Sequence, residues 1–272
     1  MKLEIPNFSE KSELFKWLVE NKSTLITQKK FEVKHCDAMS FTMKSMEKEV
    51  EEADKAENTS LLIDADRVKV KLIINTTKVM DSHDDVHFDG IWKKTISESG
   101  DVYLLKEHRM TFDNIISDSM KAYTKNISWD KLGASFEGNT QALVFEGLID
   151  KGRNPYMYDQ YVKGYVKNHS VGMRYVKLYL AINDKSYSAE YDAWNKYFPE
   201  VANKEEVEEQ GYFWAVTEAK LIEGSAVVKG SNWVTPTISV VADNENKEHP
   251  TTEEHHPIDE EIKSNFYNIN LY

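Results

Sequence analysis

The chain of 272 residues is poor in cysteine, in long apolar runs and in positive charge. Its single cysteine, Cys36, excludes an intramolecular disulfide, which fits a reducing compartment. No stretch approaches the roughly 18 apolar residues that a membrane-spanning helix requires, and residues 1–15 contain no apolar segment of a secretory signal. These absences predict a protein that is made and used in a cytoplasm, or inside an assembly formed there, without a membrane partner.

The excess of acidic over basic residues indicates which classes of partner the chain can bind. The chain has 34 basic and 46 acidic residues, a net charge of -12. Nucleic-acid binding requires a surplus of lysine and arginine on the binding surface, so we expect no nucleic-acid partner. The 40% of hydrophobic and 29% of charged residues are typical of a globular protein with a substantial core.

The patterning divides the chain into three regions. Residues 1–60 are polar with short helical stretches, and they predict a helical, charged N-terminal extension. Residues 61–240 carry the β patterning and predict the main domain, in which the acidic residues 184–210 form an insertion between two strands. Residues 241–272 are polar and acidic, which predicts a flexible C-terminal tail.

Alternation of apolar and charged residues predicts strands in the main domain. Val68, Val70 and Leu72 alternate with lysines, which is the period of a half-buried strand. Further β-like runs follow at 101–108, 142–149, 171–182 and 212–228. Asn154 is a good cap for a helix over residues 155–167. We therefore expect a mainly β, α+β domain with antiparallel strands and a few packed helices.

One short string, His83-Asp84-Asp85-Val86-His87, is similar to the zinc-binding HExxH helix, with Asp where the general-base Glu belongs. That motif requires a helix that brings both histidines to one face. The flanking segments 80–82 and 88–90 are instead rich in turn-forming residues, which predicts a polar loop with two surface histidines. A metal-dependent hydrolase that uses His83 and His87 is the less favoured alternative, so we expect no metal.

Three other residues form a candidate catalytic set. His108 ends an apolar run, where a strand end can hold its ring at a cleft. Ser170 opens another strand, and Gly172 leaves its hydroxyl uncovered and lets another backbone approach. Glu223 is an acid inside an apolar strand, where a buried carboxylate requires a partner such as histidine. Each residue alone has an ordinary structural explanation, and Ser225 competes with Ser170, but together they supply a nucleophile, a base and an orienting acid.

The order of these motifs resembles that of the tailed-phage prohead maturation proteases, a family related to herpesvirus assemblin. Residues 78–108 are similar to the opening of the family, with a DV…G turn, a KTI segment and a closing histidine. The string HSVGM at 169–173 is similar to the S-(I/V)-G-(F/Y) nucleophile motif, and 221–228 to the closing L-x-E-x-S-x-V strand. The resemblance covers about residues 61–240.

The resemblance implies a closed antiparallel β-barrel surrounded by helices, with His108 as base, Ser170 as nucleophile and Glu223 as orienting acid. It implies a serine endopeptidase that cleaves the major capsid protein, the scaffold protein and itself inside the assembling prohead, in the host cytoplasm. Assemblin relatives dimerise, so a homodimer is an expectation, and no cofactor is implied. The alternative from another class is a non-catalytic capsid-assembly or scaffold protein that keeps this fold.

Overall fold

The computed structural model describes residues 3–33 and 65–243. Residues 34–60 of the expected N-terminal extension and nearly all of the expected C-terminal tail lie outside these residues. The strands are β1 (Arg67–Thr76), β2 (Asp85–His87), β3 (Val102–Lys106), β4 (Ile115–Ser128), β5 (Asn139–Asp150), β6 (Asn168–Ile182), β7 (Tyr212–Val227) and β8 (Thr237–Ala242).

The helices lie before, between and beside these strands. They are α1 (Lys11–Glu20), α2 (Lys22–Phe31), α4 (Lys93–Glu98), α5 (Pro155–Val162), α6 (Ser188–Tyr197) and α7 (Lys204–Gln210), with short 3₁₀ turns η1 (Phe112–Asn114), η2 (Asp130–Leu132) and η3 (Phe198–Glu200). Among the described helices none is long and apolar enough to cross a membrane.

The strands form one open, mixed sheet in the order β2-β7-β3-β4-β5-β1-β8, with β6 on the other edge of β7. Strand β7 pairs in parallel with β2 and β3, and antiparallel with β6. In the described part of the chain β8 pairs only with β1 and β6 only with β7, so no strand pair joins the two ends of the sheet. The fold is α+β, and the expected closed antiparallel barrel is wrong.

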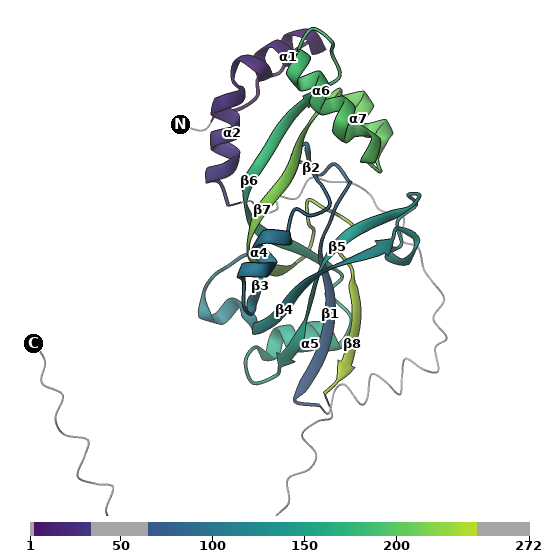
Figure 1. Ribbon diagram of the computed structural model, residues 1–272. Helices are drawn as coiled ribbons and strands as arrows, with labels where there is room; N and C mark the ends of the chain where they lie inside the picture. Colours follow the sequence, from purple (N-terminus) through teal and green to yellow (C-terminus); the bar gives the residue numbers. More distant parts are fainter. Residues whose placement is uncertain (1–2, 34–64, 244–272) are drawn as a thin grey trace, which may run out of the picture.

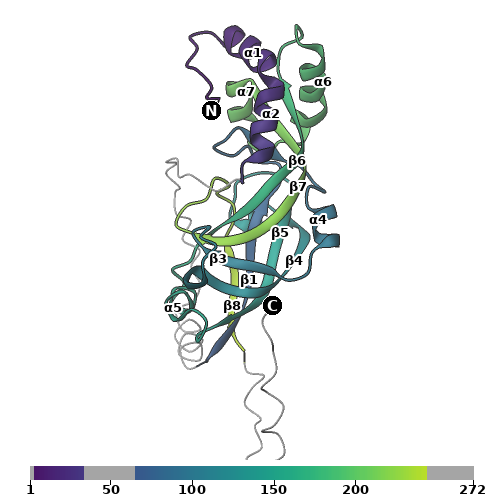
Figure 2. The ribbon, with the colours of Figure 1, turned by 90° about the vertical axis from the view of Figure 1, so that its left-hand side faces the viewer.

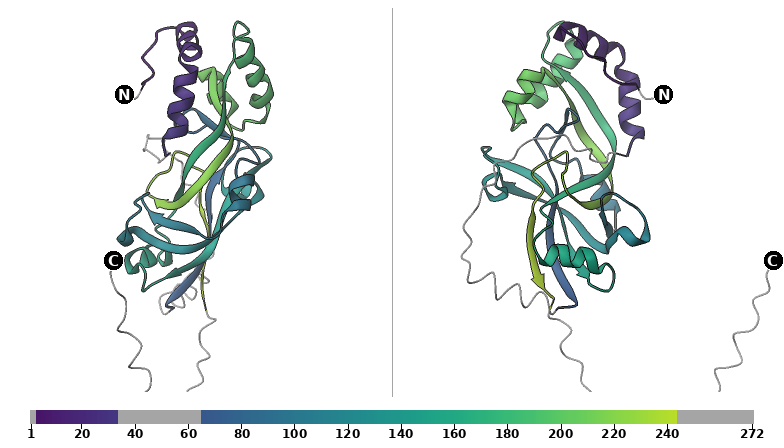
Figure 3. Two further views of the ribbon diagram at one scale, coloured as in Figure 1. Left: turned by 60° about the vertical axis from the view of Figure 1, so that its left-hand side comes forward. Right: turned by 180° about the vertical axis from the view of Figure 1, so that it is seen from behind.

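Strands β6 and β7 form a long two-stranded ribbon that leaves the rest of the sheet and rises toward a group of helices (Figure 1). The segment 184–210 forms α6, η3 and α7, which connect β6 to β7 at the upper end of this ribbon. The N-terminal helices α1 and α2 lie against the same end, as the turned views show (Figures 2 and 3). The lower end of the ribbon joins β3 and the remaining strands.

The apolar residues that the sequence places at regular spacing account for this arrangement. The start of β7, residues 212–216, is apolar throughout and buried, as befits a strand covered on both faces. On the N-terminal helices, Phe15, Leu18 and Leu25 point into the same core as the strands. The N-terminal helices are therefore packed parts of the fold.

Helix α5 shows how local chemistry positions the strand that follows it. The Asn154 side chain accepts a hydrogen bond from Met157 N at 3.1 Å, and Pro155 occupies the first turn. The Asn154 amide also donates to the carbonyl oxygens of Asp113 and Ile115, at 3.3 and 3.2 Å. These bonds fix α5 against the start of β4, and a short turn then leads from α5 into β6.

Candidate active site

His108 lies just beyond β3, in a turn that the parallel pairing with β7 sets up. Leu104, Leu105 and Lys106 pair with residues 224–226, and Glu107 N donates to Ala226 O at 3.0 Å. The backbone then turns left-handed at both Glu107 (φ 53°) and His108 (φ 57°). For residues other than glycine such a conformation costs about 1–3 kcal/mol each, and it persists where the surroundings hold it in place.

The His108 ring contacts the carboxylate of Glu223, the residue that the sequence predicts as its partner. His108 Nδ1 lies 2.6 Å from Glu223 Oε1, and the two side chains are 7% and 1% exposed. A carboxylate accepts hydrogen bonds, so the Nδ1 atom carries the proton in this pair. That tautomer leaves a lone pair on Nε2, which is the arrangement a general base requires.

Ser225 completes the contacts around this pair. Its hydroxyl donates to Glu223 Oε2 at 2.6 Å and accepts a hydrogen bond from His108 N at 3.0 Å. Ser225 has no exposed surface. A serine enclosed in this way is not accessible to a substrate, so the geometry does not favour Ser225 as a nucleophile.

Ser170 lies directly beside this group, on strand β6. It is the register partner of Ser225 across the antiparallel β6–β7 pair, and Gly172 is the partner of Glu223. Directly opposed residues in such a pair point to the same face, with Cβ atoms about 4.5–5.5 Å apart. Ser170 is 8% exposed, whereas Ser225 has no exposed surface. Of the two serines, only Ser170 therefore reaches the surface.

The structure thus joins His108 to Glu223 directly and places Ser170 on the facing strand, opposite Ser225. Among the hydrogen bonds of the described residues, none joins the Ser170 hydroxyl to His108. In unliganded sites this contact is often long and shortens when substrate binds.

Gly172 is needed here for a reason other than the one we expected. A Cβ atom at Gly172 would lie 2.0 Å from Glu223 Oε1 and 2.8 Å from the carboxyl carbon. The Glu223 side chain therefore crosses directly over Gly172 on its way to His108. The space that we assigned to an approaching backbone is filled by the carboxylate.

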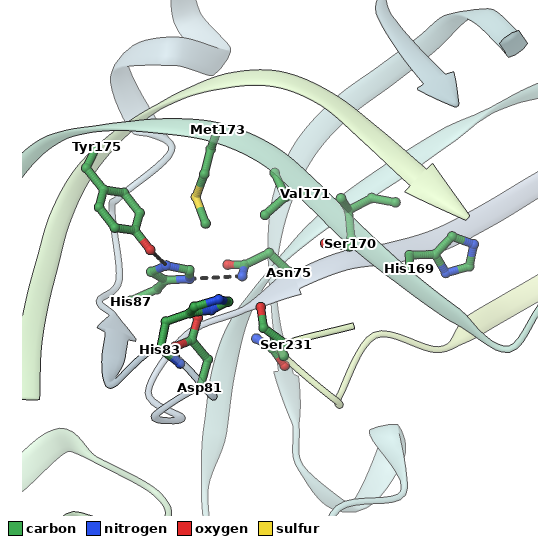
Figure 4. Close-up of a pocket in the computed structure, with 12 residues that line it drawn as sticks. Asn75, Asp81, His83, His87, His169, Ser170, Val171, Met173, Tyr175 and Ser231 are labelled. Carbon is green, nitrogen blue, oxygen red and sulfur yellow. Dashed lines mark hydrogen bonds between the residues drawn. The ribbon is translucent and has the colours of Figure 1, made fainter. Parts of the chain in front are cut away.

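A second polar cluster contains the His83–His87 string. Residues 85–87 form strand β2, and the residues before them form a turn, so the helix that a HExxH site requires is absent from this segment. His87 is buried, which corrects the expectation of two surface histidines. Its Nδ1 accepts from Asn75 Nδ2 at 3.0 Å, and its Nε2 lies 3.2 Å from the Tyr175 hydroxyl (Figure 4).

The remaining bonds of this cluster use the carboxylates that a metal would need. Tyr175 donates to Asp85 Oδ2 at 2.8 Å, and Asp81 Oδ1 accepts from the backbone N of His83 and of Asp85. Burial, together with the nearby Asp85 charge, raises the pKa of Asp81. Within residues 3–33 and 65–243 no three His, Cys, Asp or Glu side chains are placed to hold a metal ion. The geometry gives the metal-dependent alternative no support.

A small hollow lies between this cluster and strand β6. Its lining includes Asn75, His83, His87, Ser170 and Ser231 (Figure 4). Its volume is about 20 Å³, which is the space of about one water molecule. The hollow is too small for a substrate side chain, and we regard it as part of the packing beside β6.

Comparisons of the chain with protein-family models, with curated proteins and with solved structures found no match. The resemblance to the prohead proteases therefore rests on three short motifs, and the site is interpreted from its geometry.

Proposed function

We propose that this protein is a serine endopeptidase in which Ser170 is the nucleophile, His108 the general base and Glu223 the acid that orients His108. The observation that carries the proposal is the 2.6 Å hydrogen bond between His108 Nδ1 and the buried Glu223 carboxylate. Glu223 lies on β7, and the pairing of β7 with β6 places Ser170 opposite Ser225. An acid, a histidine and a serine in this order match the roles of a hydrolytic triad.

The proposed reaction uses these three groups in sequence. The Ser170 hydroxyl attacks the carbonyl carbon of the peptide bond, and His108 Nε2 takes the hydroxyl proton. His108 then gives that proton to the leaving amine, and a water molecule cleaves the acyl-enzyme by the reverse proton path. Glu223 keeps the imidazole in the required tautomer and stabilises its protonated form, as an aspartate does in other triads.

The motif resemblance supports a finer proposal about substrate and place. The substrates would be the major capsid protein and the scaffold protein of a tailed phage, cut inside the assembling prohead in the host cytoplasm. Cleavage of the protease itself and a homodimeric state belong to the same proposal. The short motifs at 78–108, 169–173 and 221–228 are its only support.

The first test compares wild type with Ser170→Ala, each co-expressed with the proposed substrate, a major capsid protein of a tailed phage. Cleavage is read by intact mass. We expect Ser170→Ala to reduce cleavage by at least about 10³-fold, because the serine of a triad contributes at least that much. Ser117→Ala is the matched control, because Ser117 is also a buried strand serine and lies on β4.

Each outcome of this test separates the alternatives. If Ser170→Ala cuts as fast as wild type, Ser170 is not the nucleophile. If wild type cuts neither the capsid protein nor itself, and Ser170 does not react with a fluorophosphonate probe, the non-catalytic capsid-assembly role takes the place of the peptidase.

A further inference from the structure

Three hydrogen bonds link His108, Ser225 and Glu223 into a closed ring, to which His108 contributes both its backbone N and its ring Nδ1. The backbone N–H of His108 donates to Ser225 Oγ at 3.0 Å, and Ser225 Oγ donates to Glu223 Oε2 at 2.6 Å. The other carboxylate oxygen, Oε1, accepts from His108 Nδ1 at 2.6 Å. One serine therefore touches both the backbone of the base and the acid that orients its ring.

The donor of the Ser225 hydroxyl and one of its two lone pairs are used by these two contacts. A hydroxyl has one proton to donate, and in this site the proton points to a carboxylate, which cannot donate one in return. The His108 N–H occupies a lone pair on the same oxygen. Ser225 therefore does not compete with Ser170 for the Nε2 atom of His108, although the two serines are register partners.

We infer that Ser225 is a positioning residue of this site: its hydroxyl holds the Glu223 carboxylate and the left-handed His108 backbone in one fixed relation. The inference rests on the proposed function, because it concerns the same base and acid. It names a residue that acts through His108 and Glu223 and does not touch the substrate.

The backbone of β3 and its turn explains why a side-chain hydroxyl is required. The last ladder bond from this segment to β7 is that of Glu107 N to Ala226 O. The next amide, that of His108, points to the Ser225 side chain, in a residue whose φ is 57°. Without the hydroxyl, the His108 amide and Glu223 Oε2 both lose a partner in a place with little water. The His108 backbone can then adopt other dihedral angles, and the Glu223 side chain can adopt other rotamers.

The experiment measures wild type, Ser225→Ala and the matched control Ser117→Ala. We expect Ser225→Ala to lower kcat by about 10- to 100-fold with KM within twofold, because a displacement of about 1 Å in a catalytic group has an effect of that size. The rate at which a fluorophosphonate probe labels Ser170 falls by the same factor. Ser117→Ala leaves kcat, KM and the labelling rate within twofold of wild type.

A spectroscopic readout follows the His108–Glu223 contact without relying on turnover. In protein labelled with ¹⁵N-histidine, the Nδ1–H proton of His108 gives a low-field resonance, assigned by its absence in His108→Gln. We expect this resonance in wild type and in Ser117→Ala, and a shift to higher field or loss by exchange in Ser225→Ala. A purely structural serine would alter the unfolding temperature and leave this resonance in place.

A second variant covers the case in which Ser225→Ala does not fold. Ser225→Cys keeps the shape of the side chain but has a much weaker donor, so it should fold and still lose kcat and the low-field resonance. The inference is overturned if folded Ser225→Ala or Ser225→Cys retains both the wild-type kcat and the resonance. Failure of the proposed function would be recognised separately from failure of this inference, because wild type itself would then neither cleave a substrate nor be labelled at Ser170.

Discussion

The room above Gly172 decides whether His108 has a partner. Glu223 occupies the volume that any other residue at position 172 would fill with its Cβ atom. The site therefore depends on an atom that is missing as much as on the groups present. A glycine in a strand commonly marks the close approach of another group, and here that group is the carboxylate of the facing strand.

Gly172→Ala is therefore expected to abolish the contact between Glu223 and His108. The added methyl group cannot coexist with a carboxylate oxygen 2.0 Å away, so Glu223 must change its rotamer. We expect a loss of the proposed peptidase activity of about 100-fold and a destabilisation of about 1–3 kcal/mol, measured by kcat and by urea unfolding. Gly100→Ala is the control, because a Cβ atom there meets no atom within 4 Å. Equal activity of the two variants would contradict this account.

At the scale of residues, the types of the candidate groups could be read from the sequence, but their contacts could not. An acid within an apolar strand and a histidine after an apolar run indicate a buried pair, and His108 and Glu223 do form one. The part played by Ser225 was not predicted. It depends on a left-handed turn at Glu107 and His108, and neither residue type signals such a turn.

At the scale of elements, the short strand β2 is stabilised by a helix far from it in sequence. All three of its residues are buried, including the charged Asp85. Lys29 of α2 reaches Asp85 Oδ1 at 2.6 Å and lies 5.3 Å from the ring centroid of Trp214. A second pair, Lys22 with the buried Glu190, joins α2 to α6. Two ion pairs thus attach the N-terminal helices to the upper end of the β6–β7 ribbon.

We expect Lys29→Ala to destabilise the protein by about 3 kcal/mol, because it removes a cation that pairs with the buried Asp85 carboxylate. The free energy of unfolding in urea measures this change. Lys30→Ala, on the exposed side of the same helix, should stay within about 0.5 kcal/mol of wild type. A result in which both lysine variants unfold alike would show that the Lys29–Asp85 pair contributes nothing.

Several elements were located by pattern, and the exceptions have physical reasons. The apolar runs at 142–149, 171–182 and 212–228 correspond to β5, β6 and β7. The expected helix over 155–167 ends at Val162, because Gly164 adopts a left-handed conformation (φ 69°). Strand β4 was not predicted, since its sequence is largely polar and much of it is exposed. Its pairing with β3 and β5 overrides a weak local preference.

At the scale of the whole molecule, the closure of a sheet is not encoded in alternation. Alternating residues indicate which face of a strand is buried, but not whether its neighbour runs parallel or antiparallel. The parallel pairs of β7 with β2 and β3 bring together segments more than 100 residues apart, and no local signal announces them. For this reason the α+β class could be predicted, whereas the open, mixed sheet could not.

One buried histidine links the stability of the whole fold to pH. His169 has no exposed surface; its Nε2 lies 3.0 Å from the Tyr161 hydroxyl and its Nδ1 lies 3.1 Å from Thr235 O. Burial lowers the pKa of His169 to about 4, although the bond to Thr235 opposes the change. The unfolded chain binds a proton near pH 6.5, so it holds more protons than the folded chain between these values.

Stability should therefore fall as the pH drops from about 6.5 to about 4, by about 3 kcal/mol from His169 alone. We expect His169→Gln to unfold at lower urea concentration near neutral pH, but to lose this part of the pH dependence. Asp81 and Asp84, whose pKa values are raised by burial, act in the opposite direction, because their contribution is lost as the pH rises. They are common to both proteins and cancel in the difference. Parallel urea midpoints of the two proteins across this range would contradict the role of His169.

The long separation of His108 and Glu223 along the chain determines when, during protein synthesis, the two residues can first form their contact. The two residues are 115 positions apart, and Glu223 is the later one. At about 5–20 residues per second, a ribosome needs about 6–23 s to pass from one to the other. Ser170 is made during that interval and Glu223 only at its end, so until then a nascent chain lacks the carboxylate partner of His108. The order of synthesis thus delays the His108–Glu223 pair until most of the described residues have been made.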